Sequence, residues 1–373
     1  MSLVFPDYEN SILNLASSVF RAYDIETPHP TLTLLDSYLV RRHRNRVFLI
    51  LDGMGVDFLE HALPPESFLR QHIVHTITSV YPSTTAAAIT TYQTGMSPLE
   101  HGWLGWSLFF KEFGRSVDVF LDRDTMTGIE IKPSPAQTFL PFNDKTCEVR
   151  QAGGIPAQCR RILPPFAEAG VSSMSQLVAK IREYCLNGEN QLIAAYWYEP
   201  DSLMHRDGPY CEKAVQEIQA YDAMLTELAT ELKDTLFIIS ADHGQVEIER
   251  DIIINDIPAL DECLIMPPSI EGRAASLFVK PARLRDFRQT FSILLGEEFL
   301  LMSRAEAFDR GLFGPGKAHP KVDDFVGDFV ACGIGKSILR YRTCFERPMT
   351  LFKGHHAGLL KEEMLVPLII VET

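Results

Sequence analysis

The stretch VFLILDGMG, residues 47–55, decides how the rest of this sequence is interpreted. Five apolar residues lead directly into Asp52 and Gly53, and such a run is typical of a strand buried on both faces of a parallel sheet. Ligands of open parallel sheets gather beyond the carboxyl ends of the strands, so the Asp52 carboxylate is a candidate metal ligand. The alternative is a simple turn, for which an Asp-Gly pair is also common.

Four further apolar runs, rich in Val, Ile and aromatic residues, have the same character. They are IVHTITSV (73–80), QLIAAYWY (191–198), TLFIIS (235–240) and LVPLIIV (365–371). Helical patterns separate several of them, and residues 207–233 repeat apolar side chains at the spacing of one helix face. Strands that alternate with helices predict an α/β fold, a three-layer α/β/α sandwich with a mostly parallel central sheet.

Two regions interrupt this alternation. Residues 131–168 hold six prolines without a clear period, and we interpret them as an irregular excursion over the site. Residues 245–350 contain strand-like and helical pieces of their own, at 274–281, 282–295 and 324–333. We therefore expect 245–350 to form a smaller inserted α/β lobe, with 1–244 and 351–373 forming the main catalytic domain.

The composition restricts the kinds of partner. A net charge of −14 argues against binding to a nucleic-acid duplex, whose phosphates attract basic surfaces. A small anionic substrate remains compatible, because bound metal ions add positive charge locally. We see no apolar run long enough to span a bilayer, no signal-peptide pattern, and seven cysteines without a CxxC pair. These features favour a cytoplasmic protein that has no membrane partner, and they carry no signal of oligomeric state.

Three other segments offer Asp and His side chains at positions comparable to Asp52. Asp201 and His205 are four residues apart, so a helical turn would place both on one face. Asp242 and His243 lie just after the run at 235–240, separated from it by Ala241, and His356 lies between glycines in KGHHAG. Each item alone has an incidental explanation, such as a loop histidine. Together, three Asp and three His suit two divalent ions, of which zinc fits best and manganese or iron are alternatives.

A fifth segment, YPSTTAAAITTYQTG (81–95), places hydroxyl side chains where a helix should begin. The free N–H groups and positive dipole end of a helix N-terminus favour an anion, and also an ionised hydroxyl. The alternative is that Ser83 or Thr84 caps the helix. One hydroxyl could also cap while its neighbour reacts.

In combination these residues match a known family. The pieces LILDGMG, YPSTTAAAITTYQTGMSPLEHGW, YEPDSLMHRDGP, ISADHGQ and GHHAGLLKEEMLVPLII occur in family order from about residue 46 to 371. The chain thus resembles the alkaline phosphatase superfamily, and most closely its type I phosphodiesterase and nucleotide pyrophosphatase branch. The resemblance implies an alkaline-phosphatase-like fold and a metal-dependent hydrolase.

The resemblance also implies roles for the site residues. Its motifs assign three ligands to each of two ions: Asp52, Asp242 and His243 to one, and Asp201, His205 and His356 to the other. Thr85 lies ten residues before Gly95, which is the family position of the nucleophile. We expect the first ion to coordinate the Thr85 hydroxyl as well, and so to ionise it. His355 takes the place of His356 if the register differs by one.

The expected reaction is cleavage of phosphodiester or nucleotide pyrophosphate bonds through a phosphothreonine intermediate at two metal ions. The substrate would be a small phosphate ester, with a nucleotide as one candidate. The branch usually has an Asn three residues after the nucleophile, where it helps to hold a phosphate oxygen, and this chain has Ala88 there. A phosphomonoesterase and a phosphomutase on the same fold are therefore the alternatives.

Overall fold

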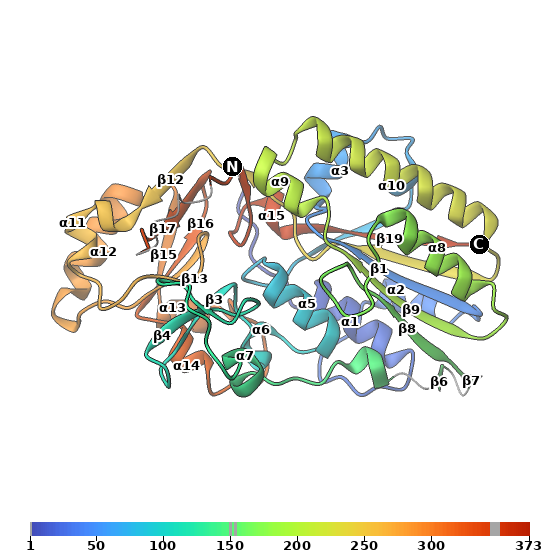
Figure 1. Ribbon diagram of the computed structural model, residues 1–373, viewed down its shortest axis with the longest axis horizontal. Helices are drawn as coiled ribbons and strands as arrows, with labels where there is room; N and C mark the ends of the chain where they lie inside the picture. The colour runs from blue at the N-terminus through green and yellow to red at the C-terminus, as the bar shows by residue number, and fades with distance from the viewer. Residues whose placement is uncertain (1, 149–150, 153–154, 344–350) are drawn as a thin grey trace.

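The computed structural model describes all residues except 1, 149–150, 153–154 and 344–350. The two largest β-sheets lie side by side, each with its own helices (Figure 1). The larger sheet has six strands in the order β2-β19-β10-β1-β9-β8. Their bounds are β1 (Asn45–Leu51), β2 (Ile73–Thr78), β8 (Gln158–Ile162), β9 (Gln191–Trp197), β10 (Thr235–Ser240) and β19 (Leu365–Glu372).

The larger sheet is mostly parallel, as predicted. Strands β10, β1, β9 and β8 pair in parallel, and β19 runs antiparallel between β10 and β2. All side chains of β1 and β10 are buried, which explains the continuous apolar runs at 47–51 and 236–239 within them. The topology confirms the α/β prediction that began with residues 47–51.

Helices cover both faces of this sheet and complete the three layers (Figure 1). One face carries α3 (Val56–Ala62), α8 (Met174–Cys185) and α10 (Glu212–Glu231), and the other carries α1 (Ile12–Arg21), α2 (Thr33–Leu39) and α5 (Thr85–Thr94). Helix α10 buries Ala214, Ile218, Tyr221, Leu225 and Leu228, which follow the predicted helix spacing. Among the described residues, no helix is both long and apolar enough to cross a membrane.

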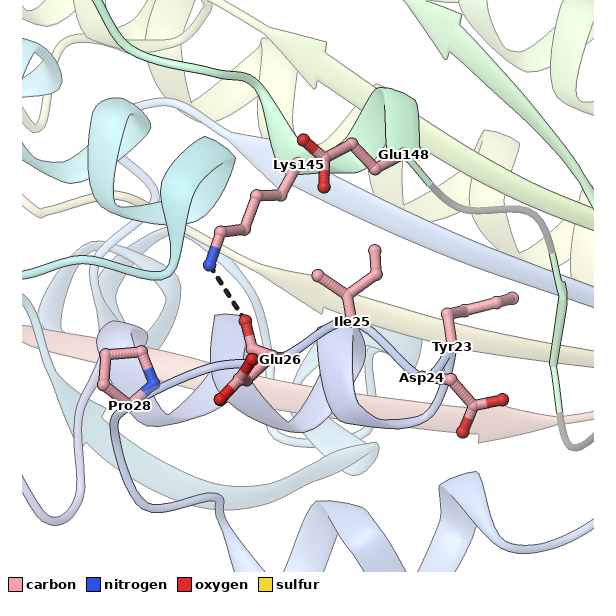
Figure 2. A pocket seen from close by; sticks show the side chains of 7 residues that line it. All are labelled: Tyr23, Asp24, Ile25, Glu26, Pro28, Lys145 and Glu148. Carbon is pink, nitrogen blue, oxygen red and sulfur yellow. Dashed lines mark hydrogen bonds between the residues drawn. The ribbon is translucent and has the colours of Figure 1, made fainter.

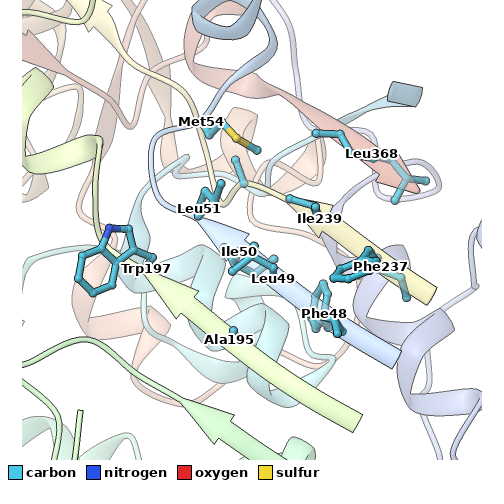
Figure 3. Close-up of a cluster of buried hydrophobic side chains, with 14 of the residues drawn as sticks. Phe48, Leu49, Ile50, Leu51, Met54, Ala195, Trp197, Phe237, Ile239 and Leu368 are labelled. Atoms are coloured by element: carbon cyan, nitrogen blue, oxygen red, sulfur yellow. The ribbon is translucent and has the colours of Figure 1, made fainter. Parts of the chain in front are cut away.

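The core between these layers is continuous, and Figure 3 shows its centre around β1, β9 and β10. Phe48, Leu49 and Ile239 are at most 5% exposed. Burial of each such side chain stabilises the fold by about 1.5–3 kcal/mol. The Trp197 indole N–H donates to the Tyr221 hydroxyl at 2.9 Å, which ties the end of β9 to α10.

The smaller lobe is built on a second, seven-stranded sheet in the order β15-β16-β14-β13-β3-β4-β5. Its strands are β3 (Ser107–Phe110), β4 (Arg115–Asp118), β5 (Arg123–Asp124), β13 (Ser269–Glu271), β14 (Ala274–Leu277), β15 (Phe299–Ser303) and β16 (Phe329–Gly333). Helix α12 (Leu284–Leu295) buries Phe287 and Phe291 in this lobe. The sheet thus includes three strands from 107–124, outside the range 245–350 expected for the lobe. The domain division itself stays a prediction.

Residues 131–168 are more regular than expected. They include α7 (Pro135–Phe139) and strand β8, which extends the main sheet parallel to β9. Within β8 only Ile162 is buried, so its sequence QCRRI has no apolar run that would reveal an edge strand. Residues 149–150 and 153–154 of this stretch lie outside the described part.

Shorter elements connect these units. The helices are α4 (Phe68–Gln71), α6 (Pro98–His101), α9 (Asp201–Asp207), α11 (Pro258–Asp261), α13 (Arg304–Asp309), α14 (Val322–Phe325) and α15 (Lys361–Met364). The strands are β6 (Gln151–Ala152), β7 (Ile155–Pro156), β11 (Val246–Glu247), β12 (Arg250–Ile253), β17 (Ser337–Arg340) and β18 (Gly354–His355). Three short 3-10 helices are Lys145–Glu148, Ile254–Asp256 and Pro281–Arg283.

A buried ion pair joins the two sheets close to the predicted site. The Arg273 guanidinium donates through Nε and Nη2 to the two carboxylate oxygens of Glu363, each at 2.7 Å, and both side chains are fully buried. Glu363 Oε1 also accepts the backbone N–H of Gly358 at 2.7 Å. A bidentate, charge-assisted pair of this kind fixes geometry strongly, so it holds the loop that carries His356.

Candidate metal centre

Three of the predicted segments meet beyond the carboxyl ends of adjacent parallel strands. Asp52 follows β1 directly, Asp201 begins α9 just after β9, and Asp242 follows β10. Gly53 has φ +73°, and a Cβ added there would lie 3.1 Å from the Cα of Asp201. A glycine therefore lets the chain turn tightly after β1 against the start of α9. The Asp-Gly turn and the candidate ligand are both present.

The six predicted ligands form two groups of three. Asp52, Asp242 and His243 form one, and Asp201, His205 and His356 form the other; within each group the ligand atoms lie within 4.8 Å of one another. His243 Nε2 is 3.3 Å from Asp242 Oδ2, and His205 Nε2 is 3.4 Å from Asp201 Oδ2. The rings of His243 and His356 stack with centroids 3.8 Å apart, so the two groups are adjacent.

All three histidines are oriented in the same way. The Nδ1 atoms of His205, His243 and His356 lie 2.8–3.0 Å from the backbone carbonyl oxygens of Gly354, Gly244 and Ser83, respectively. A carbonyl only accepts, so each Nδ1–H donates and each Nε2 keeps its lone pair. This is the arrangement that orients a histidine for a metal ion. Burial and nearby histidines also lower the pKa of His356, which keeps its ring neutral.

The carboxylates provide the test of whether a cation fits. Asp52 Oδ1 and Asp242 Oδ2 are buried and have no hydrogen-bond partner within the described chain. Burial raises the pKa of both carboxyl groups, and the pKa of Asp52 is raised further by Asp242 and Asp201. Packing three carboxylates together out of water is costly without a compensating charge. Two buried, unpaired oxygens beside neutral imidazoles are therefore a donor set that fits a divalent ion.

Thr85 is the first residue of α5 and lies beside the first group. Its Oγ1 is 3.4 Å from Asp52 Oδ2 and 3.2 Å from His243 Nε2. The side chain of Thr85 is partly exposed, whereas Asp242 and His243 are fully buried. The Thr85 hydroxyl therefore lies at the more accessible side of the first group.

The neighbouring hydroxyls do not cap helix α5. Ser83 donates to the carbonyl of Gly358 at 3.0 Å, Thr84 donates to Glu271 Oε1 at 2.8 Å, and no side chain caps the helix. The capping alternative for Ser83 and Thr84 is therefore wrong. The amide groups at the start of α5 stay available, which suits an anion at this helix end.

Three further residues support the site, and our sequence interpretation did not assign them. The Tyr196 hydroxyl donates to Asp52 Oδ2, and the Gln245 side-chain amide donates to Asp201. Glu271, from the smaller lobe, accepts from Thr84 and from the Trp106 backbone N–H at 2.8 Å, and burial raises its pKa to about 7. Only Gln245 lay in a recognised motif, ISADHGQ. Tyr196 is part of an apolar strand, and Glu271 ends the short strand β13, whose three residues give no recognisable pattern.

Two positions that were left open are located by the structure. His356 joins Asp201 and His205, whereas His355 belongs to β18, pairs with Val246 and is not in either group within the described chain. Ala88 is fully buried one turn along α5 from Thr85. The site accordingly has no side-chain amide at that position.

A separate cavity of about 620 Å³ contains none of these residues (Figure 2). It is lined by Tyr23, Asp24, Ile25, Glu26, Pro28, Lys145 and Glu148. The Lys145 ammonium donates to the carbonyl of Glu26 across its mouth at 2.9 Å. The metal centre therefore does not use this space.

Comparison with known proteins agrees with this arrangement. The family model for type I phosphodiesterase / nucleotide pyrophosphatase matches residues 131–285, which include Asp201, His205, Asp242 and His243. The match confirms the predicted resemblance to that family, and with it the prediction of a phosphoester hydrolase. No curated protein matches the chain by sequence.

Solved structures share the fold at low sequence identity. Murine ectonucleotide pyrophosphatase / phosphodiesterase 5 has a TM-score of 0.59 at 20% identity, with 89% of this chain and 88% of that chain covered. Its inactive threonine-to-alanine variant in complex with AMP has a TM-score of 0.58 at 20% identity, covering 88% and 87%. Phosphonoacetate hydrolase from Sinorhizobium meliloti 1021 in complex with phosphonoacetate has 0.59 at 17% identity, covering 88% and 90%. These structures confirm the predicted fold.

Proposed function

We propose that this protein hydrolyses small phosphate esters by attack of the Thr85 hydroxyl at a centre of two divalent metal ions. The observation that carries the proposal is the convergence of four distant segments into two adjacent ligand groups, one of which contacts Thr85, with His205, His243 and His356 each presenting Nε2 toward a carboxylate. Asp52, Asp242 and His243 would hold the ion beside Thr85, and Asp201, His205 and His356 would hold the other. Zinc suits this Asp/His set best, with manganese and iron as alternatives.

The bound ions supply positive charge that favours ionised oxygen and neutralises phosphate at this centre. The residues of the chain position the reacting atoms. The Tyr196 hydroxyl and the Thr85 hydroxyl both contact Asp52 Oδ2, so Tyr196 fixes the carboxylate that Thr85 faces. The uncapped amide groups at the start of α5 would donate to the nonbridging phosphate oxygens as charge develops on them.

The reaction takes place in two displacements at phosphorus. In the first, Thr85 Oγ1 loses its proton and forms a bond to phosphorus, while the bond from phosphorus to the leaving oxygen breaks. The leaving group departs as an alcohol or phosphate after taking up a proton. In the second, water attacks phosphorus, the bond from phosphorus to Thr85 Oγ1 breaks, and Thr85 regains a proton. The net change is addition of one water across the ester.

The comparisons support a small nucleotide-like substrate. The murine relative was solved with AMP as an inactive variant in which a threonine is replaced, which agrees with a threonine nucleophile here. Ala88 has no side-chain amide that could donate to a phosphate oxygen. The lack of this contact favours a second candidate function, that of a phosphomonoesterase, which depends less on it. A phosphomutase is the further alternative, and it would release neither free phosphate nor a nucleotide.

The test compares hydrolysis of bis-p-nitrophenyl phosphate, p-nitrophenyl phosphate and a dinucleotide by the metal-loaded protein. Thr85→Ala should lower kcat by about 10³-fold or more with unchanged metal content, since it removes the nucleophile. The matched control is Thr84→Ala, whose hydroxyl contacts Glu271 and should matter far less. Equal activity of the Thr85→Ala variant and the parent would rule out the covalent step.

A further inference from the structure

A second cavity, of about 590 Å³, lies at the opposite end of the main sheet from the metal centre. Arg44 and Arg46, at the start of β1, and Asn190 and Gln191, at the start of β9, contribute to its wall. Asp52 is six residues beyond Arg46 along β1, which corresponds to roughly 20 Å in an extended strand. The cavity is therefore distinct from the proposed active site.

The wall of this cavity is strongly basic. Six basic side chains line it: Arg21, Arg41, Arg42, His43, Arg44 and Arg46. The acidic groups nearby are Asp24 and Asp36 in the wall, Glu372, which pairs with Arg41 and His43, and Asp234, whose Oδ1 accepts the Arg44 backbone N–H at 3.1 Å. Five arginines thus stand against four nearby carboxylates, only two of which line the cavity, in a chain whose net charge is −14. The cavity concentrates positive charge where the chain as a whole is negative.

Arg46 is the most constrained of these side chains. It is 8% exposed, and its Nη2 donates to the carbonyl of Leu39 at 2.9 Å. Its Nε and Nη1 are buried with no hydrogen-bond partner among the described residues, as are Arg44 Nε and His43 Nδ1. The Arg46 guanidinium also lies over the Tyr23 ring, 5.2 Å from its centroid, which offsets part of the cost of burying its unused donors. An oxyanion is the natural acceptor, because the planar fork of arginine matches a phosphate group.

We propose that this cavity is a second binding site, and that its ligand is a small phosphate-bearing anion. Arg46 forms the base of the site, and Arg42 and Arg44 contact the ligand from the rim. The volume falls in the range of small-molecule sites and exceeds what one phosphate fills, so an organic group such as a nucleoside can accompany the phosphate. A concave site with a buried arginine suits a small ligand better than a nucleic-acid duplex, which the net charge also disfavours.

The test is calorimetric titration of ADP, and separately of inorganic phosphate, into the metal-loaded Thr85→Ala protein. The Thr85→Ala protein should bind one more equivalent of ligand per chain than the same protein that also carries R42Q/R44Q. Each lost arginine–phosphate contact corresponds to about a tenfold weaker site. If R42Q/R44Q also loses one equivalent of inorganic phosphate, the phosphate group alone is sufficient for binding. If the loss is seen only with ADP, the nucleoside contributes to binding.

The matched control is R285Q/K317Q, which removes two positive charges from exposed positions outside the cavity. It should titrate like the parent. Unchanged binding by R42Q/R44Q, or an equal loss in the control, would overturn the proposal. R42Q/R44Q made with Thr85 intact should keep the basal hydrolysis rate, so failure of this site is distinguishable from failure of the proposed function. R46M should abolish binding at the site. Because Arg46 is buried and its replacement can also disturb folding, R42Q/R44Q is the primary test.

Discussion

Replacement of Arg273 by methionine should destabilise the protein and loosen the loop that carries His356. The substitution leaves the Glu363 carboxylate fully buried, with the Gly358 and Leu360 backbone N–H groups as its remaining partners. Breaking a buried pair in this way costs about 3–5 kcal/mol. A chain of 373 residues has an unfolding entropy of about 0.8 kcal/mol/K, so the melting temperature should fall by about 4–6 °C.

Differential scanning calorimetry on Arg273→Met, Glu363→Gln and the double variant provides the assay. The double variant should lose less than the sum of the two single losses, because it removes the uncompensated charge together with its partner. Arg288→Met is the matched control, since Arg288 pairs with Glu306 at the surface and should cost at most about 1 kcal/mol. A drop for Arg273→Met no larger than that of the control would refute the reasoning.

Three further predictions concern the site. Treatment with a chelator should abolish hydrolysis and lower the melting temperature, and added zinc should restore both; a chelated enzyme of full activity would contradict the metal centre. Asp242→Asn should lose bound metal and activity together, measured by elemental analysis, whereas the exposed control Asp309→Asn should keep both. Burial raises the pKa of Glu271 from 4.5 to about 7, so its stabilising contribution is complete below pH 4.5 and is lost as the pH rises through about 7. The unfolding free energy of the parent should therefore decrease between pH 5 and pH 8 by roughly 1–3 kcal/mol more than that of Glu271→Gln, as measured in denaturant titrations. An equal decrease in the two proteins would show that Glu271 does not titrate in this range.

The two groups of candidate metal ligands could be predicted from the sequence because their members follow the ends of apolar strands. Asp52 and Asp242 each come just after a fully buried run, and parallel strands bring such positions to one edge of a sheet. Asp201 and His205 meet because their spacing equals one helical turn. For these residues, the local sequence pattern was sufficient to predict their position in the fold.

The rest depends on contacts that no local pattern encodes. Strand β8 is an edge strand of mainly polar residues, and β3 to β5 are too short to give a clear alternation. Glu271 reaches the site only because the second sheet meets the main sheet beside α5, and Tyr196 reaches Asp52 because β9 pairs with β1. The sequence RRHRNR (41–46) would ordinarily suggest a solvated surface, and only the tertiary fold shows that Arg46 lies at the base of a cavity.

The most direct measurement is anomalous scattering at the zinc absorption edge from crystals of the zinc-loaded protein. The account predicts two peaks, one among Asp52, Asp242 and His243 beside the Thr85 hydroxyl, and one among Asp201, His205 and His356. A single anomalous peak, or peaks at other positions in crystals of fully active protein, would contradict the account.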